Sequence, residues 1–221
     1  MGDSRVLRMC GKVRAKKTWQ ASVSPDAAAD DGDSVTYRVM NDLPIIVCDG
    51  GQRYVMPMRW GFPDPADWRR PRPINARAET IDTTPAFARA FRDGQRGILL
   101  VESFNEAPKS GAQQIFTLPK PAGIAMLWRR FAIADASPFA AVMVTVPANA
   151  LVGDLPADRM PALLAQADWA AWLGDNGATP ADAKACLKTV EGVRWTMAAE
   201  QRTAAKRAKP TVADPLGLFQ F

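Results

Sequence analysis

The sequence predicts a single domain of the α+β class, and three observations support this prediction. The chain has 221 residues, of which 48% are hydrophobic, and this is enough for one sizeable core. Residues 34–146 contain a series of short strand-like segments separated by glycines and prolines. Signals for helix starts and stops occur once within this region and again after it. We therefore expect a sheet-rich domain with helices added to it.

A hairpin is expected at the start of the strand-rich region. Residues 35–39 alternate in polarity with a period of two, and residues 45–47 form a short apolar run. Asp49-Gly50-Gly51 separates that run from residues 53–56 and is typical of a hairpin turn. A buried strand is expected over residues 98–101, continuing into residues 102–106, with further strands over 113–118, 123–128, 139–146 and 193–196.

Helices are predicted where capping residues precede apolar periodicity. Thr83-Thr84-Pro85 is expected to open a helix that Gly94 ends, because threonine caps helices and proline suits their first turn. A second helix is expected from Pro161 to the glycine stop at Gly174, and its apolar face would consist of Leu164, Trp169, Trp172 and Leu173. Two more are expected over residues 179–188 and, as a basic, alanine-rich stretch, over residues 198–209.

Composition narrows the chemistry available to the chain. The net charge is +5 and the isoelectric point is about 9.3, which is compatible with a polyanionic partner. Histidine is absent, which removes Cys-His and Ser-His nucleophile pairs and the commonest ligand of transition metals. We therefore expect no metal and no cofactor, and any catalysis must use carboxylates, amines, thiols or amides.

Cysteine use and hydropathy indicate where the chain functions. The three cysteines, Cys10, Cys48 and Cys186, are too scattered for a disulfide framework, which favours a reducing cytoplasm. No apolar run approaches the ~20 residues that a membrane span needs. We expect a cytoplasmic monomer that does not bind membranes.

Residues 59–80 form the most distinctive stretch of the chain. Arginines and prolines are concentrated there together with two tryptophans, Trp60 and Trp68. Guanidinium groups suit phosphates, exposed indoles can stack on unpaired bases, and prolines lower the entropy lost when a loop is ordered. The alternative is an ordinary surface loop whose tryptophans pack into the core. Four arginines, Arg59, Arg69, Arg70 and Arg72, precede Asn75-Ala76-Arg77.

Five short motifs together resemble those of one known family. In chain order they are Met9-Cys10-Gly11, Arg59-Trp60-Gly61, Asn75-Ala76-Arg77-Ala78-Glu79-Thr80, Phe104-Asn105-Glu106 and Asp158-Arg159-Met160-Pro161. This order is similar to that of the SOS response-associated peptidase (SRAP) family, which shields abasic sites in single-stranded DNA. The resemblance implies a mostly antiparallel, barrel-like sheet with peripheral helices, here over residues 10–221, with residues 1–9 as an N-terminal extension.

The resemblance implies that Cys10 captures abasic sites covalently. In the family, the cysteine after the initiator methionine forms a thiazolidine with the aldehyde of the opened sugar. In this sequence the nitrogen of Cys10 is a peptide amide, which cannot form an imine. We therefore hypothesise that translation starts at Met9, or that processing removes the extension, so that Cys10 becomes N-terminal. The alternative is a buried structural cysteine.

The resemblance also assigns roles around the lesion. Asn75 would hold the sugar, and Glu106 would supply a carboxylate for acid-base steps, with Glu102 as a rival on the same predicted strand. DNA contacts would come from Arg77, which would bind phosphate, and from Arg59, Trp60, Trp68 and Arg159. Asp158 and Arg159 have an alternative role as part of an internal ion pair.

Several positions depart from the family pattern. Ala157 stands where the family has a histidine, Arg38 stands where an active-site asparagine follows the tyrosine, and Asn105 replaces an aromatic residue. Three functions remain open: covalent capture of abasic sites, single-stranded DNA binding without chemistry, and a Cys10-dependent self-processing peptidase. Whether the chain is an enzyme, a hydrolase or a lyase, is also open.

Overall fold

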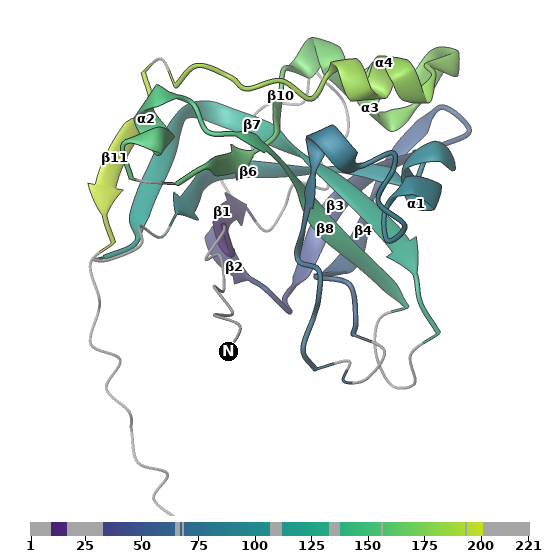
Figure 1. Cartoon of the computed structure of the whole chain (residues 1–221), viewed down its shortest axis with the longest axis horizontal. Helices are drawn as coiled ribbons and strands as arrows, with labels where there is room; N and C mark the ends of the chain where they lie inside the picture. Colours follow the sequence, from purple (N-terminus) through teal and green to yellow (C-terminus); the bar gives the residue numbers. More distant parts are fainter. Residues whose placement is uncertain are drawn as a thin grey trace, which may run out of the picture.

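The chain folds around one highly curved sheet, as the computed structural model shows (Figure 1). The structure describes residues 10–16, 33–64, 67, 69–106, 112–132, 138–155, 157–192 and 194–200. Within these residues the sheet has eleven strands: β1 Lys12–Lys16, β2 Ser34–Arg38, β3 Asp42–Asp49, β4 Gln52–Trp60, β5 Asn75–Arg77, β6 Arg96–Glu106, β7 Gln114–Arg130, β8 Phe139–Pro147, β9 Arg159–Pro161, β10 Leu163–Leu164 and β11 Thr196–Ala199.

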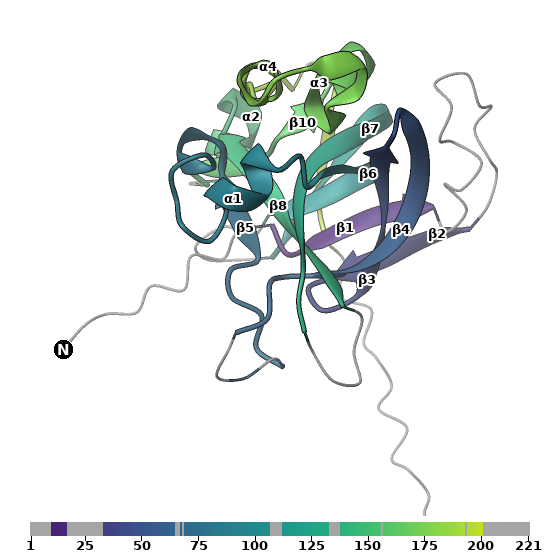
Figure 2. The ribbon, with the colours of Figure 1, turned by 90° about the vertical axis from the view of Figure 1, so that its right-hand side faces the viewer.

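Five of these strands close into a ring. β6 pairs antiparallel with β7, β7 with β8, β3 with β4 and β3 with β6, and a parallel pairing of β4 with β8 completes the circle. β1 adds to the free edge of β6 and β2 adds to β1. The expected α+β domain with a mostly antiparallel, barrel-like sheet is therefore confirmed. Figure 2 shows the ring from the side.

The hairpin between β3 and β4 forms as predicted. Asp49 pairs with Gln52, which leaves Gly50 and Gly51 as a two-residue loop. Both glycines have positive φ angles, 57° and 80°. A two-residue hairpin loop of this kind needs positive φ at both positions, and glycine adopts it without steric cost.

The strands predicted over residues 113–118 and 123–128 are one continuous strand, β7. The two prolines between the predicted strands, Pro119 and Pro121, indicated a break, because proline cannot donate to a strand ladder. In the structure the pairing with β6 shifts its register here, so that Val101 pairs with Ala122 and Ser103 with Thr117. The prolines occupy the unpaired bulge, where no donor is needed.

The helices are shorter than predicted and lie outside the ring. They are α1 Ala88–Arg92, α2 Ala150–Gly153, α3 Trp169–Leu173 and α4 Pro180–Ala185, and short 3₁₀ turns cover residues 78–80, 166–168 and 175–177. Figure 2 shows α3 and α4 together at one end of the barrel. No helix in the described part of the chain has the length and apolar character needed to cross a membrane.

The prediction of one helix from Pro161 to Gly174 is wrong in its first half. Pro161 ends β9, and β10 follows at once, because both segments find strand partners in β8 and β7. The second half does form α3, which Gly174 ends with a left-handed φ of 84°. Trp169 and Trp172 are buried, as expected for an apolar face.

The remaining elements near the C-terminus are displaced from their predicted limits. α4 begins after Thr179, which forms a capping box with Asp182, but the helix ends at Ala185 instead of near Lys188. The strand predicted over residues 193–196 lies later in the chain, as β11 at Thr196–Ala199. Because β11 includes Ala198, the prediction that a helix starts there is wrong. Residues 201–209 of that prediction lie outside the described residues.

One glycine marks the point where β3 packs against the start of β6. A methyl group on Gly97 would lie 2.4 Å from Cγ2 of Ile45 and 3.1 Å from the backbone oxygen of Ile46. The indole of Trp172 also donates to the Gly97 carbonyl at 2.8 Å. The close packing of the ring at this point thus requires a residue without a side chain.

We therefore expect Gly97→Ala to lower the free energy of unfolding by about 1–3 kcal/mol, the usual cost of overpacking a core. Urea denaturation of both proteins would measure the difference. Gly153→Ala is a matched control, because no atom lies within 4 Å of the added methyl group. Equal stability of Gly97→Ala and the unsubstituted protein would contradict this account of the packing.

Candidate functional site

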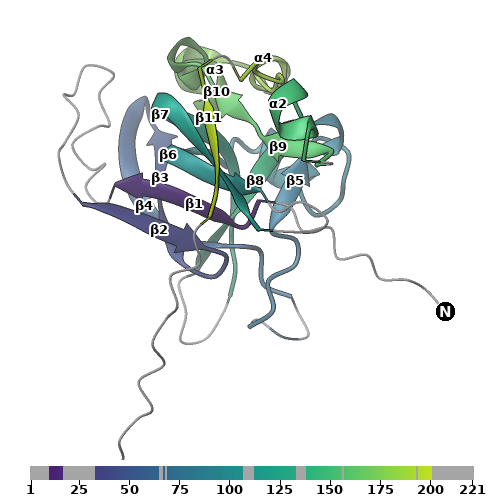
Figure 3. The same cartoon turned by 90° about the vertical axis from the view of Figure 1, so that its left-hand side faces the viewer.

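The pairing of β1 with β6 brings Cys10 to the end of β6. Val13 pairs with Phe104 and Arg14 with Ser103, and the two strands run in opposite directions. The residues just before β1 therefore lie beside the last residue of β6, which is Glu106. Both side chains are buried, with exposed fractions of 1% for Cys10 and 3% for Glu106. Figure 3 shows β1 next to β6 at this side of the barrel.

Glu106 and the backbone of Cys10 are in direct contact. The backbone N–H of Cys10 donates a hydrogen bond to the Glu106 carboxyl group. Burial raises the pKa of Glu106 to about 8, the Cys10 hydrogen bond opposes this increase, and the charge of Asp158 adds to it. Desolvation disfavours the carboxylate, so this side chain holds its proton up to an unusually high pH.

The thiol of Cys10 is held close to the same carboxyl group. Its Sγ donates weakly to the backbone oxygen of Lys12, at 3.6 Å. Burial raises the pKa of the thiol well above its usual value, and the negative charge of Glu106 raises it further. The thiol is therefore protonated at neutral pH, and the charge of the nearby Glu106 carboxyl group influences its pKa.

Asn75 has a buried side chain whose amide is unsatisfied. It begins β5 with an exposed fraction of 8%, and neither its Oδ1 nor its Nδ2 has a hydrogen-bond partner within the described part of the chain. Burying an unpaired polar group costs about 1–3 kcal/mol, so each such group calls for an explanation. A ligand that supplies both a donor and an acceptor would satisfy this amide.

Two residues of the Arg59-Trp60-Gly61 motif contact the segment that precedes Asn75. The indole of Trp60 is fully buried and donates to the backbone oxygen of Ile74, at 3.2 Å. Gly61 has a φ of 105°, and a methyl group there would lie 2.4 Å from Cβ of Pro71. These two residues thus fix the chain on either side of the loop that leads into Asn75.

Two of the motifs are joined by an ion pair. Arg159 binds both carboxylate oxygens of Glu79, at 2.6 and 2.9 Å, and also donates to the backbone oxygen of Thr145. The Arg159 side chain is only 10% exposed. The guanidinium group also lowers the pKa of Glu79. Arg159 therefore serves the internal ion pair that the sequence offered as an alternative.

The predicted DNA-binding residues differ in how far they are exposed to solvent. Arg77 is exposed at the end of β5, two residues after Asn75. Trp60 cannot stack on a base in this conformation, because its exposed fraction is 0%. Arg59 lies half-buried in β4, and Trp68 lies outside the described residues.

The structure separates the two carboxylates that the sequence left as rivals. Glu102 lies away from Cys10, where it accepts a hydrogen bond from Ser34 at 2.6 Å and pairs with Arg14 at 3.7 Å. Only Glu106 is beside Cys10. Sequence reasoning did not predict that the charge of Asp158 raises the pKa of Glu106. The signal was that Asp158 follows Ala157, which stands at the position of the family histidine.

The described residues contain no group of three or more histidine, cysteine, aspartate or glutamate side chains arranged to hold a metal ion. The site presents a thiol, a backbone nitrogen, a carboxyl group and an amide. These groups can exchange protons with a bound molecule and hold it by hydrogen bonds.

Several solved structures share this fold. A protein from Bordetella bronchiseptica is 22% identical, with a TM-score of 0.68 over 87% of this chain and 100% of its own. A protein from Bacteroides thetaiotaomicron is also 22% identical, with a TM-score of 0.65 over 76% of this chain and 78% of its own. A phage-related protein from Bordetella bronchiseptica is 17% identical, with a TM-score of 0.65 over 87% and 95%.

The family follows from the sequence match. A search of curated proteins returns no match. The model of the SOS response associated peptidase (SRAP) family matches residues 9–203, which include Cys10, Asn75 and Glu106. The chain therefore belongs to the SRAP family, which is associated with DNA damage and the SOS response.

Proposed function

We propose that this protein captures abasic sites in single-stranded DNA as a covalent adduct of Cys10. The observation that carries the proposal is the hydrogen bond from the Cys10 backbone nitrogen to the Glu106 carboxyl group. The family match begins at Met9, directly before Cys10. If Met9 is the initiator and is removed, this nitrogen becomes a free α-amine beside a carboxyl group that can exchange protons with it.

The reaction consists of two additions and one loss of water. The amine of Cys10 attacks the aldehyde carbon of the opened sugar, and the resulting carbinolamine loses water to give an imine. The thiol sulfur then adds to the imine carbon while its proton moves to the nitrogen. A five-membered thiazolidine is formed, and the only other product is water.

Glu106 is suited to moving the protons in this sequence. An α-amine has a pKa of about 7.7–8.0, and burial raises the pKa of Glu106 to about 8 in the chain whose Cys10 nitrogen is an amide. Proton transfer between groups of matched pKa is efficient near neutral pH. Glu106 can therefore take a proton from the attacking amine, return it to the departing hydroxyl group, and then relay the thiol proton to the ring nitrogen during ring closure.

Asn75 and Arg77 are suited to holding the DNA. The unsatisfied amide of Asn75 can donate to and accept from the sugar oxygens. Arg77 is two residues further along the same strand, about 6–7 Å away, and its exposed guanidinium group can pair with a phosphate. Trp60 has no place in this proposal, because it is buried.

The same contact supports a second candidate, self-processing before Cys10. Attack of the thiol on the preceding carbonyl would give a thioester and release the Cys10 nitrogen, which needs a proton. Glu106 holds a proton at neutral pH and is hydrogen-bonded to that nitrogen. Water would then hydrolyse the thioester. Mass spectrometry of the purified 221-residue chain over time would detect a product that begins at Cys10.

We expect protein that begins at Cys10 to form an adduct with an abasic single strand that survives a denaturing gel without borohydride. The chain with residues 1–9 intact should form none, because its Cys10 nitrogen is an amide. Cys10→Ala, also prepared with a free N-terminus, is the matched control. It retains the amine and should be trapped only when borohydride reduces the imine.

Equal adduct formation by the intact 221-residue chain, with Met1 verified by mass, would overturn the proposed role of the Cys10 amine. Tight binding of the strand without any adduct from the Cys10-started protein would instead support the binding module that lacks chemistry.

Glu106→Gln should slow adduct formation by about a hundredfold, because it keeps the size of the side chain and removes its proton transfer. Single-turnover rates of protein beginning at Cys10 would measure the effect. Glu102→Gln is the matched control and should react at the unsubstituted rate, since Glu102 pairs with Arg14 and Ser34. A loss confined to Glu102→Gln would assign the chemistry to the other carboxylate.

The raised pKa of Glu106 also predicts how stability depends on pH. Between about 4.5 and about 8 the folded protein keeps a proton on Glu106 that the unfolded chain releases. Stability should therefore fall as pH rises through this window, by up to about 1.4 kcal/mol for each pH unit. Urea denaturation of the 221-residue chain at several pH values would show the slope, and Glu106→Gln should flatten it. Parallel profiles of the two proteins would contradict the buried, protonated carboxyl group.

A further inference from the structure

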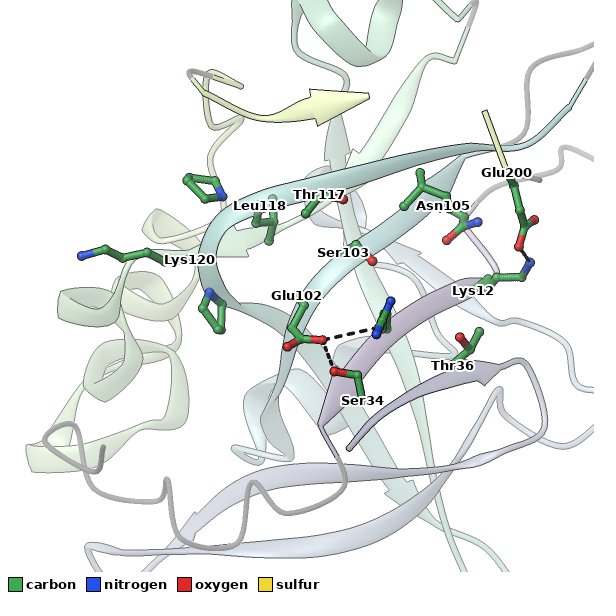
Figure 4. A pocket seen from close by; sticks show the side chains of 14 residues that line it. Lys12, Ser34, Thr36, Glu102, Ser103, Asn105, Thr117, Leu118, Lys120 and Glu200 are labelled. Atoms are coloured by element: carbon green, nitrogen blue, oxygen red, sulfur yellow. Dashed lines mark hydrogen bonds and ion pairs between the residues drawn. The ribbon is translucent and has the colours of Figure 1, made fainter. Parts of the chain in front are cut away.

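A polar groove lies on the other face of the strands that carry the candidate site. Successive residues of a strand point to opposite faces, so Asn105 faces this groove while Glu106 faces Cys10. β1, β2, β6 and β7 form its walls and floor (Figure 4). Its volume is about 520 Å³, within the range of about 300–1,000 Å³ that small ligands occupy in proteins.

Asn105 supplies an unsatisfied donor at the floor of the groove. Its side chain is 5% exposed, and its Nδ2 has no hydrogen-bond partner among the residues that the structure describes. Ser103 and Thr117, which pair across β6 and β7, add two hydroxyl groups further along the groove. A buried amide donor with hydroxyl neighbours calls for a ligand that carries hydrogen-bond acceptors.

Charged residues are found at the rim of the groove. Lys12 forms an ion pair with Glu200 at one end, and Lys120 is exposed at the other (Figure 4). Arg14 is 60% exposed and pairs with Glu102. The three cations exceed the two carboxylates, and each carboxylate already has a cation beside it, so the rim can accept an anionic group.

Two of the strands that form the groove, β1 and β6, offer no free edge to a peptide. β1 is paired on one side with β2 and on the other with β6, and β6 is paired in turn with β1 and β7. Recognition over these two strands must therefore use side chains. A neutral polar floor with Asn105, apolar contacts from Ile115 and Leu118, and cations at the rim suit a base with its attached phosphate.

We propose that this groove holds one nucleotide of the strand that carries the lesion, with the base against Asn105 and the phosphate near the rim cations. This inference rests on the proposed function, because it assigns a second position on the same single strand. Lys12 is two residues from Cys10 and Asn105 is adjacent to Glu106, so a strand that leaves Cys10 reaches the groove by passing around the ends of β1 and β6.

The test measures binding of undamaged, fluorescently labelled single strands by anisotropy. Asn105→Leu should weaken binding of a long oligothymidine about tenfold, the lower end of what a base-edge contact contributes. Thr117→Val, which removes one hydroxyl group at constant shape, should weaken it in the same direction. Gln52→Leu is the matched control, because Gln52 is an exposed amide on β4 outside the groove, and it should bind as the unsubstituted protein does.

A position scan then identifies the base. A stable abasic analogue without an aldehyde replaces one nucleotide at a time, and the unsubstituted protein should lose affinity at one position that Asn105→Leu no longer senses. The proposal would be overturned if the loss of affinity from the abasic analogue and the loss from Asn105→Leu add at every position. Unchanged binding by both Asn105→Leu and Thr117→Val would also overturn it. These strands have no aldehyde, so a failure of covalent capture by Cys10 would leave this result intact and would count against the proposed function alone.

Discussion

The pairing of β6 on both of its edges is the constraint on which the rest of the structure depends. One edge runs along β7, and the other meets β3 at Ile98 and β1 at Phe104. The contacts with β7 and β3 make β6 part of the closed ring of strands. The contact with β1 brings the start of β1 to the end of β6. Ten of the eleven residues of β6 are buried. The location of Cys10 is therefore a consequence of how β1 pairs with β6.

Burial of the strand end accounts for the chemistry available there. Glu106 ends β6 in an environment that penalises its charge, and the resulting pKa of about 8 lies in the range where an α-amine titrates. The chain contains no histidine, the usual residue for proton transfer near neutral pH. A desolvated carboxyl group beside the Cys10 nitrogen can take over that role. The proposed reaction then needs no histidine at the position of Ala157.

The family motifs act through one another instead of each contacting a ligand. Trp60 supports Ile74 and hence Asn75, while Arg159 binds Glu79 from the same stretch as Asn75 and Arg77. In this structure Trp60 is buried and Arg159 forms an ion pair with Glu79. Each face of β6 carries a residue that one of the two proposals uses. These residues, Glu106 on one face and Asn105 on the other, are adjacent in sequence.

The sequence by itself determined the elements whose signals are local. A two-residue glycine turn specified the β3–β4 hairpin, and the Thr179 cap specified the start of α4, because backbone conformation and capping depend on neighbours in the chain. Only the tertiary structure decided whether residues around Pro161 became strand or helix, which of Glu102 and Glu106 lies beside Cys10, and that Trp60 is buried. Each of these outcomes depends on partners distant in sequence, and no local pattern records which strand edge or cavity a residue will meet.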